Sequence, residues 1–173
     1  PIYNRTKKFR ISLCPQIGGY FADLSAEDNL KAVGEILIKD KKFRKLKIEE
    51  LISKFELDAV RKVEAKHLSG GYKRRLTISM SLLGEPEILL MDEPLAALDP
   101  QTIQMLQNII IKLQSEYNLT ILITDHQARD LLVVCDKAFI LANSKIVAEG
   151  TPNQLMRNVN AAKYYFGDNF KFK

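Results

Sequence analysis

An acidic pair directly follows a short apolar run near the middle of this 173-residue sequence. The run, Ile88 to Met91, is bounded by turn residues, and Asp92 and Glu93 come next. This pattern is typical of a buried parallel strand whose last residues emerge at its carboxyl end. Asp92 is suited there to bind Mg²⁺, which takes one or two carboxylates, and Glu93 can orient or deprotonate a water. Standing alone, such a pair is equally typical of a helix cap or a solvated loop.

Two further polar side chains are expected just beyond strand ends. The apolar run Ile11–Cys14 is stopped by a proline, and Gln16 follows. His126 comes soon after the apolar run Thr120–Thr124. Ligands of open α/β sheets bind outside the carboxyl ends of the strands, so we expect both side chains to converge on one crevice with the acidic pair. His67 has no comparable context, and we interpret it as a structural histidine.

Two helix starts could also serve a phosphate or a partner. Ser69, Gly70 and Gly71 precede an apolar helical stripe. Backbone N–H groups and the positive end of the helix dipole suit a phosphate there, and glycines let the backbone approach closely. A plain capped turn would show the same residues. At the second start, Asp99 can cap a helix that has Pro100 at its first position.

Residues 24–66 show helical spacing and no strand pattern, so we expect an all-helical insertion. Ser25 can cap its first helix, with Asp28 three residues later. A second helix is predicted from Ile48 to Phe55. The run Lys39–Lys47 contains charges of both signs, which is typical of a solvated helix face.

Strand and helix patterns alternate in the rest of the chain, which predicts an α/β fold with an open, mostly parallel sheet. Asn143 and Ser144 join two short runs as a hairpin turn, and Thr151 can cap the closing helices. The expected strands are Ile11–Cys14, Ile88–Met91, Thr120–Thr124 and the hairpin pair Ala138–Leu141 and Lys145–Ala148. Two of the expected helices carry apolar stripes, at Leu76–Leu83 and Ile103–Leu113. A third is expected at Ala128–Val134.

Taken together, these motifs resemble those of the ATP-binding-cassette (ABC) ATPases in both order and spacing. Each motif alone is weakly specific, whereas the whole series in order is very specific, and it covers essentially the whole chain. The matching stretches are Pro15-Gln16 (Q-loop), Leu68-Ser69-Gly70-Gly71 (signature), Ile88 to Pro94 (Walker B), Ala97-Leu98-Asp99-Pro100 (D-loop) and Thr124-Asp125-His126 (switch histidine).

The resemblance implies a P-loop NTPase-like ABC cassette. Its expected parts are a helical subdomain at 24–66, the signature helix and catalytic core at 67–150, and a C-terminal helical tail at 151–173 that follows the β-hairpin. It also implies hydrolysis of ATP with Mg²⁺, in which the protein positions groups and stabilises charge around the γ-phosphate. The implied residues are Glu93 and His126 for catalysis, Gln16, Ser69, Gly70, Gly71 and Asp99 for the nucleotide, and Asp92 and Gln16 for the metal.

Partners follow from the same resemblance. It implies a head-to-tail homodimer, in which the signature of one subunit binds the γ-phosphate of ATP held by the other, docked on two integral membrane subunits. Ile17, Tyr20 and Phe21 are unexpectedly apolar for a loop and are candidates to line the groove for those subunits. Tyr72 occupies a signature position that is often Gln or Glu, which removes a side-chain contact and leaves the backbone cradle intact.

The phosphate loop G-x-x-x-x-G-K-[ST] occurs nowhere in the sequence. In the family that the chain resembles, this loop precedes the Q-loop. We therefore expect it upstream of Pro1 in a longer protein, and we expect residues 1–173 alone not to hydrolyse ATP. A non-catalytic fragment is the alternative interpretation.

Within the family, several stretches are most similar to the ATP-binding subunits of bacterial lipopolysaccharide exporters. Subunits of branched-chain amino-acid importers are the alternative, because they share the character of the tail. A soluble ABC protein acting on ribosomes or DNA usually has a second cassette or a long insertion, and the sequence shows neither. The stretches are 14–16, 24–30, 124–130, 148–152 and the tail Tyr165 to Phe170.

Composition sets the broad class. A hydrophobic content of 46% suits a single globular domain, and no run approaches the roughly 18 to 20 apolar residues that span a bilayer. The net charge of +5 could favour nucleic acid, yet the basic residues lie in mixed runs, and we expect no nucleic-acid partner. Cys14 and Cys135 sit in separate apolar runs and are interpreted as small buried hydrophobes, which suits a reducing cytoplasm. The family resemblance implies a cytoplasmic protein at the inner face of the membrane.

Overall fold

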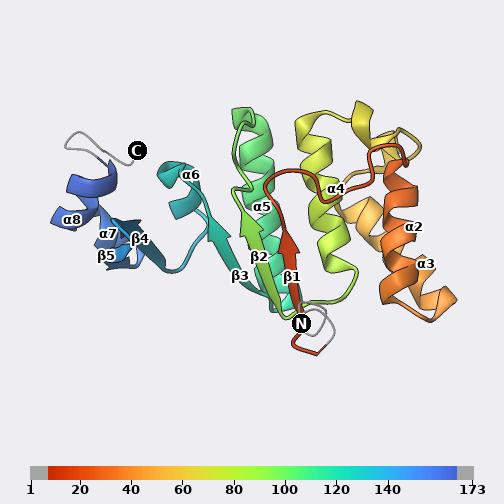
Figure 1. Ribbon diagram of the computed structural model, residues 1–173, viewed down its shortest axis with the longest axis horizontal. Coiled ribbons are helices and arrows are strands. Elements are labelled where there is room, and N and C mark those ends of the chain that lie inside the picture. The colour runs from red at the N-terminus through yellow and green to blue at the C-terminus, as the bar shows by residue number, and fades with distance from the viewer. Residues whose placement is uncertain (1–7, 167–173) are drawn as a thin grey trace. The chain divides into compact units, whose positions relative to one another are not determined.

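The computed structural model describes residues 8–166, and the chain divides into two compact units, residues 1–124 and 125–173 (Figure 1). The tail residues 167–173 and the first residues, 1–7, lie outside the described part. The first unit contains β1 (Ile11–Cys14), α2 (Ala26–Leu37), α3 (Lys41–Lys54), α4 (Gly70–Leu82), β2 (Ile88–Asp92), α5 (Pro100–Tyr117) and β3 (Thr120–Thr124). The second contains α6 (Ala128–Leu132), β4 (Ala138–Ala142), β5 (Lys145–Gly150), α7 (Pro152–Met156), α8 (Val159–Ala161) and a π-helical turn (Ala162–Phe166).

The first unit is built on a parallel sheet of order β1-β2-β3, which confirms the predicted strands and their direction. Cys14 pairs with Met91, and Asp92 pairs with Thr124, so the carboxyl ends of the strands meet at one edge. Strand β2 extends one residue beyond its predicted end and includes Asp92. Leu89 is fully buried, as expected for a central strand of a parallel sheet.

The other face of the sheet carries a row of leucines. Leu13, Leu90 and Leu122 lie opposite one another across the three strands. The side chains at the two ends of the row are well exposed, Leu13 at 58% and Leu122 at 56%. This face is therefore an apolar surface of the described first unit.

The helical insertion begins as predicted and continues differently. Ser25 caps α2, and its hydroxyl oxygen accepts a hydrogen bond from the Asp28 N–H at 3.1 Å. The second helix, α3, begins at Lys41, two turns before the predicted Ile48. The prediction was wrong because it followed apolar spacing, whereas the start is set by the Asp40 carboxylate, which accepts from the Phe43 N–H at 2.7 Å.

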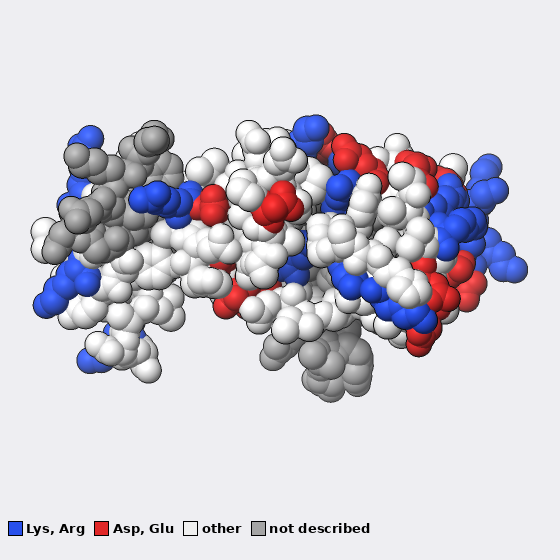
Figure 2. All heavy atoms as spheres, turned by 90° about the horizontal axis from the view of Figure 1, so that it is seen from above, with Lys and Arg blue, Asp and Glu red and all other residues white. Residues whose placement is uncertain are grey.

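The basic run of α3 is only partly solvated, which corrects the expectation for Lys47. Its side chain is buried, and its ammonium lies 5.1 Å from the centroid of the Tyr117 ring and 3.1 Å from the Glu50 carboxylate. On the surface of the first unit around α2 and α3, charged side chains of both signs are intermixed (Figure 2). One face of α3 therefore packs on the end of α5 through a cation–π contact.

A buried carboxylate organises the insertion. Glu27 in α2 has a side chain only 8% exposed, and its oxygens accept from the Arg61 guanidinium at 3.0 and 3.2 Å. Lys31 at 2.8 Å and Lys62 at 2.5 Å bind the same carboxylate. Arg61 also binds Glu49 of α3 at 2.9 Å. This network joins α2, α3 and the segment after them, because a buried charge requires such partners.

The first turns of α4 and α5 pack closely together. A Cβ atom placed on Gly71 would lie 2.9 Å from the Thr102 methyl group, closer than side chains tolerate. The Thr102 hydroxyl donates to the Asp99 carboxylate at 2.6 Å. On Gly70, by contrast, a Cβ atom would meet Leu98 at an ordinary 3.6 Å. Glycine is therefore required at the second position of α4 for contact with α5.

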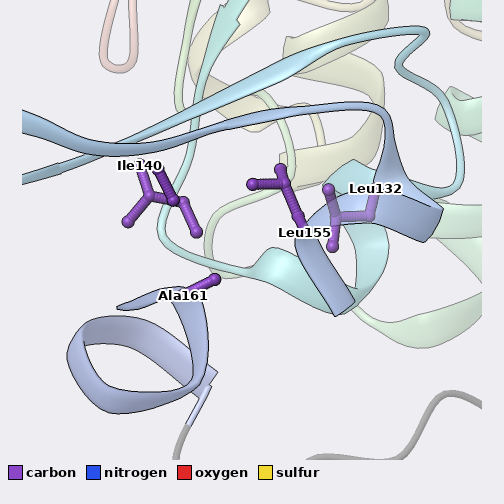
Figure 3. Packing of buried hydrophobic residues seen from close by; sticks show 5 residues of the cluster. Leu132, Ile140, Leu155 and Ala161 are labelled. Atoms are coloured by element: carbon purple, nitrogen blue, oxygen red, sulfur yellow. The ribbon is translucent and has the colours of Figure 1, made fainter. Parts of the chain in front are cut away.

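The second unit is an antiparallel hairpin covered by short helices. Asn143 and Ser144 both have positive φ, 50° and 60°, as a two-residue hairpin turn requires, which confirms the predicted turn. Thr151 caps α7 as predicted, and it also forms a capping box with Gln154. Helix α6 is shorter than expected and ends at Leu132, before Val134. The small core of this unit consists of Leu132, Ile140, Ala148, Leu155 and Ala161, all of which except Ala148 are labelled in Figure 3.

The two cysteines are both free, and they differ in burial. Cys14 is fully buried, and its burial raises the pKa of the thiol to about 11. Cys135 is only half-buried, which corrects the expectation that both are core residues. It follows the short helix α6 and packs against the edge of the second unit's small core, which covers one side of it.

We predict that Glu27→Gln lowers the free energy of unfolding by about 2 kcal/mol at pH 7, because a charged hydrogen-bond acceptor is lost from a buried site. Hydrogen bonds from Arg61 hold the Glu27 pKa below its ordinary value of 4.5. The stabilisation is therefore complete above pH 4.5 and is lost as the pH falls through the lower pKa of the folded state. Denaturant unfolding of the wild type and the Glu27→Gln variant at a series of pH values measures how their free energies of unfolding approach each other as the pH falls.

The matched control is Glu35→Gln, because that carboxylate is 69% exposed and lies 3.7 Å from Arg44. We expect this change to alter stability by no more than a few tenths of a kcal/mol, as for a surface ion pair. Equal stabilities of the Glu27 variant and the wild type at pH 7 would contradict the buried-network account.

We predict that Gly71→Ala destabilises the first unit by about 1 to 3 kcal/mol, because the new methyl group displaces Thr102. The matched control is Gly70→Ala, where the space is sufficient and alanine favours the helix. Thermal unfolding of the two variants checks the difference. A Gly71→Ala protein as stable as Gly70→Ala would show that the contact between the two helices is not tight.

Candidate functional site

The structure brings three of the predicted residues together at the carboxyl edge of the sheet. Gln16, two residues after β1, donates from its amide Nε2 to the Glu93 carboxylate at 2.6 Å. Asp92 ends β2 with its side chain exposed, and one of its oxygens accepts from the Thr124 hydroxyl at 2.7 Å. The predicted convergence is thus confirmed for Gln16, Asp92 and Glu93. Their chemistry suits a metal-bound phosphate and an attacking water.

The backbone at Glu93 has an uncommon conformation. Its φ is +42°, in the left-handed region that residues with a Cβ rarely adopt. Its N–H donates to the Thr124 carbonyl at 2.8 Å, which extends the β2–β3 ladder by one step beyond Asp92. This kink turns the chain immediately after the strand, so that the adjacent side chains of Asp92 and Glu93 can point in different directions. Such strain is commonly found at functional sites.

The Ser-Gly-Gly segment begins α4 as predicted. The Ser69 hydroxyl oxygen accepts from the Tyr72 N–H at 3.5 Å, and both Ser69 and Gly70 are exposed. A 13-residue helix starts here, so its N-terminal N–H groups face an accessible surface. The Tyr72 ring lies over the Arg75 guanidinium at 4.4 Å, which directs this side chain along the helix.

Asp99 caps α5, which confirms the predicted cap. The Asp99 carboxylate accepts from the Thr102 N–H at 3.0 Å and from the Thr102 hydroxyl, and these bonds lower the pKa of Asp99. Because Gly71 packs on the same threonine, the Ser-Gly-Gly segment and Asp99 lie side by side in the first unit. The structure therefore groups these two exposed helix starts.

His126 belongs to the second unit, so its predicted convergence with the acidic pair stays a prediction. Its side chain is 66% exposed, and its Nδ1 lies 3.9 Å from the Asp125 carboxylate. The Asp125 side chain is fully buried and accepts from the Gln127 N–H at 2.9 Å, and the Asp125 carbonyl accepts from the Tyr165 hydroxyl at 3.2 Å. Contacts around Asp125 thus set the backbone from which His126 projects. The exposed His67 has its Nδ1 3.8 Å from the Glu64 carboxylate.

The donor set at the sheet edge fits Mg²⁺ better than a metal held by protein alone. Within residues 8–166, no three His, Cys, Asp or Glu side chains gather into a metal-binding cluster. Mg²⁺ is commonly held by one or two carboxylates together with waters and the phosphates of a substrate. The exposed carboxylate of Asp92 and the amide oxygen of Gln16 provide oxygen ligands of that kind.

Three contributors to the site were missed by sequence reasoning. Arg74 of α4 donates to backbone carbonyls beside Gln16 and Glu93 and is nearly buried. Thr124 holds Asp92, and Thr102 holds Asp99. Only Thr102 had a local signal, because it follows its cap by three residues. The other two act across the fold and have no local pattern.

An exposed apolar segment follows Gln16. Ile17 is 85% exposed and Phe21 is 51% exposed, whereas Tyr20 is half-buried. Phe21 is fixed through its backbone, which exchanges hydrogen bonds with the buried Asn29 side chain at 2.7 and 3.0 Å. No helix in the described part of the chain is long and apolar enough to cross a membrane. The segment thus presents apolar side chains on an anchored backbone.

Comparison with known proteins identifies relatives over nearly the whole chain. Residues 3–96 match the ABC transporter family. The chain is 38% identical over 173 residues to the lipopolysaccharide export system ATP-binding protein LptB of Haemophilus influenzae, covering 99% of this chain and 70% of that protein. Identity to LptB of Escherichia coli K12 is 33% over 174 residues, with the same coverage.

Solved structures share the fold. One is cbiO1 from Clostridium perfringens, part of the ABC transporter complex cbiONQ, with a TM-score of 0.79 and 21% identity over 90% of this chain and 62% of that one. Another is an ATP-binding cassette of an ABC transporter in its ADP conformation, with a TM-score of 0.78 and 21% identity over 95% of this chain and 71% of that one. The predicted cassette fold is thus confirmed, and the chain belongs to the ABC transporter family as an ATP-binding protein.

Proposed function

We propose that the complete protein containing this chain hydrolyses ATP to drive lipopolysaccharide export through integral membrane subunits. The observation that carries the ATPase part is the contact between Gln16 and Glu93 at 2.6 Å, beside the exposed Asp92 at the same sheet edge. The similarity to exporter subunits supports the choice of lipopolysaccharide over branched-chain amino acids. The cytoplasmic side of the membrane is the proposed location.

Each residue at the sheet edge has a proposed role. Asp92 would hold Mg²⁺, with Gln16 as a further ligand, and the bound metal would supply charge neutralisation for phosphoryl transfer. Glu93 accepts the proton of the attacking water, and the Gln16 amide orients that carboxylate. His126 donates a hydrogen bond to the γ-phosphate. Separate tasks for adjacent carboxylates are possible because the chain turns at Glu93.

Two further sets of groups are proposed to bind the phosphates of ATP. The exposed Ser69 and Gly70, with the half-buried Gly71, are proposed to face the γ-phosphate of ATP held by a second copy, with Asp99 beside them at that interface. The proposed phosphate loop belongs to a part of the protein outside this sequence.

For the complete protein, we predict that Glu93→Gln lowers kcat by about 10²- to 10⁴-fold and leaves ATP binding intact, because it removes the base and keeps the metal ligand. The measurements are steady-state phosphate release and equilibrium binding of labelled ATP. Glu87→Gln is the matched control, since the Glu87 side chain is 66% exposed and the residue immediately precedes β2, at the end opposite Asp92. Turnover near the wild-type rate in the Glu93 variant would refute the proposed base.

We predict that the double change Ile17→Ser and Phe21→Ser weakens association with the membrane subunits at least tenfold, because these exposed apolar side chains would be buried at that interface. Co-purification of the complete protein from its own membranes, with the bound subunits identified by mass spectrometry, gives the measurement. Ile146→Ser is the control, since Ile146 is 58% exposed in the second unit. Recovery of amino-acid importer subunits in place of exporter subunits would reject the lipopolysaccharide assignment.

A further inference from the structure

One buried arginine binds the backbone on both sides of the proposed catalytic residues. The Arg74 side chain projects from α4, and the residue is 8% exposed. Its Nη1 donates to the Pro15 carbonyl at 2.5 Å, its Nη2 to the Asp92 carbonyl at 2.8 Å and its Nε to the Pro94 carbonyl at 3.1 Å. Pro15 immediately precedes Gln16, and the other two carbonyls flank Glu93.

A guanidinium is the only side chain that can make this set of contacts. It carries five N–H donors in a planar fork, whereas a lysine ammonium is a compact point charge on a flexible chain. Burial of a positive charge is unfavourable unless several acceptors surround it, and here three carbonyl dipoles do so. The three directions of the fork fix three separate points of backbone relative to one another.

The hydrogen bonds from Arg74 to these carbonyls restrict the backbone conformation of Glu93. Its φ of +42° is unfavourable for a residue with a Cβ and persists only where the surroundings hold it. The carbonyls before and after Glu93 are both bound by Arg74, and its own N–H is bound by Thr124. The Gln16 amide then meets the Glu93 carboxylate from a loop held by the same guanidinium.

Arg74 also lies on the helix that begins with the Ser-Gly-Gly segment. It is five residues after Ser69 on α4, so the guanidinium is rigidly connected to the helix start. The Thr77 hydroxyl, on the next turn of α4, lies 3.3 Å from the carbonyl of Gly18 in the loop after Gln16. Displacement of α4 therefore shifts the backbone of both Gln16 and Glu93.

We propose that Arg74 is a positioning residue that holds Glu93 and Gln16 in their reactive geometry and couples that geometry to the signature helix α4. This inference rests on the proposed role of Glu93 as the base. In this proposal Arg74 contacts neither the attacking water nor the phosphate. It acts only through the backbone around Gln16 and Glu93. Replacement of the Arg74 guanidinium is expected to release Glu93 from its left-handed backbone conformation and to leave nucleotide binding unchanged.

The test compares Arg74→Lys with Arg75→Lys in the complete protein. Arg75 is its neighbour on α4 and binds the Phe55 carbonyl and the Glu56 carboxylate instead. We expect Arg74→Lys to lower kcat about 10²-fold with KM changed less than threefold, because misplacement of a reacting group by about 1 Å has that effect. Arg75→Lys is expected to change kcat less than threefold.

A double-mutant cycle with Glu93→Gln separates positioning from general stability. If Arg74 acts through Glu93, Arg74→Lys will lower the residual rate of the Glu93→Gln protein less than threefold. A further loss of about 10²-fold in that background would overturn the proposal. Failure of both Arg74→Lys and Arg74→Gln to fold would also overturn it, since Arg74 would then be a stability residue.

Hydrogen–deuterium exchange gives a readout that does not depend on turnover. We expect Arg74→Lys to accelerate exchange at least tenfold in the peptide 88–95, which contains the Glu93 N–H, whereas Arg75→Lys does not. Unchanged exchange in Arg74→Lys would overturn the positioning role even in an active enzyme. If the wild-type protein had no ATPase activity, only the proposed function would be contradicted. The exchange experiment would still test whether Arg74 holds the backbone around Glu93.

Discussion

The register of three parallel strands is the constraint on which the candidate site depends. Because Cys14 pairs with Met91 and Asp92 pairs with Thr124, the strands end together, and the residues after them must emerge at one edge. A shift of one residue in β2 would exchange its buried and exposed faces and remove Asp92 from the Thr124 hydroxyl. The buried Leu89 favours that register through packing, because a shift of one residue would turn it to the exposed face. The proposed chemistry is therefore a consequence of sheet geometry.

Two kinds of buried charge then fix the surroundings of this edge. In the insertion, Glu27 is surrounded by cations and holds α2 and α3 together. Near the sheet, Arg74 is surrounded by carbonyl groups and holds loops to α4. Both groups satisfy the requirement that a charge removed from water finds polar partners. The first stabilises the insertion, and the second ties the signature helix α4 to the proposed base.

Sequence reasoning identified the features that depend on local patterns. The caps at Ser25, Asp99 and Thr151 were predicted because a cap bonds to a backbone group only three residues away. The strands and the acidic pair followed from apolar runs that end in turn residues. Helix α3 was predicted too short, because its first two turns are basic and have no apolar stripe. Lys47 was misread, because its burial depends on Tyr117, distant in the sequence.

The contacts that complete the site are long-range and could not be predicted. Arg74 and Pro15 are 59 residues apart, and Gln16 and Glu93 are 77 apart. Their meeting depends on which strands pair and on how α4 crosses them. The conformation of Glu93, with φ of +42°, likewise follows from tertiary hydrogen bonds that oppose its intrinsic preference. The predicted roles of Ser69 and Asp99 require a second copy, and that of His126 requires the placement of the second unit.

The central claim is that the carboxyl edge of the sheet is where ATP and Mg²⁺ meet their catalytic side chains. A crystal structure of the complete protein with Mg²⁺ and a non-hydrolysable ATP analogue tests it most directly. The account predicts the metal beside the Asp92 carboxylate, with Glu93 facing a water in line with the γ-phosphate and the Ser-Gly-Gly segment of a second copy on its far side. A metal bound elsewhere, with Asp92 and Glu93 left in solvent, would contradict the account.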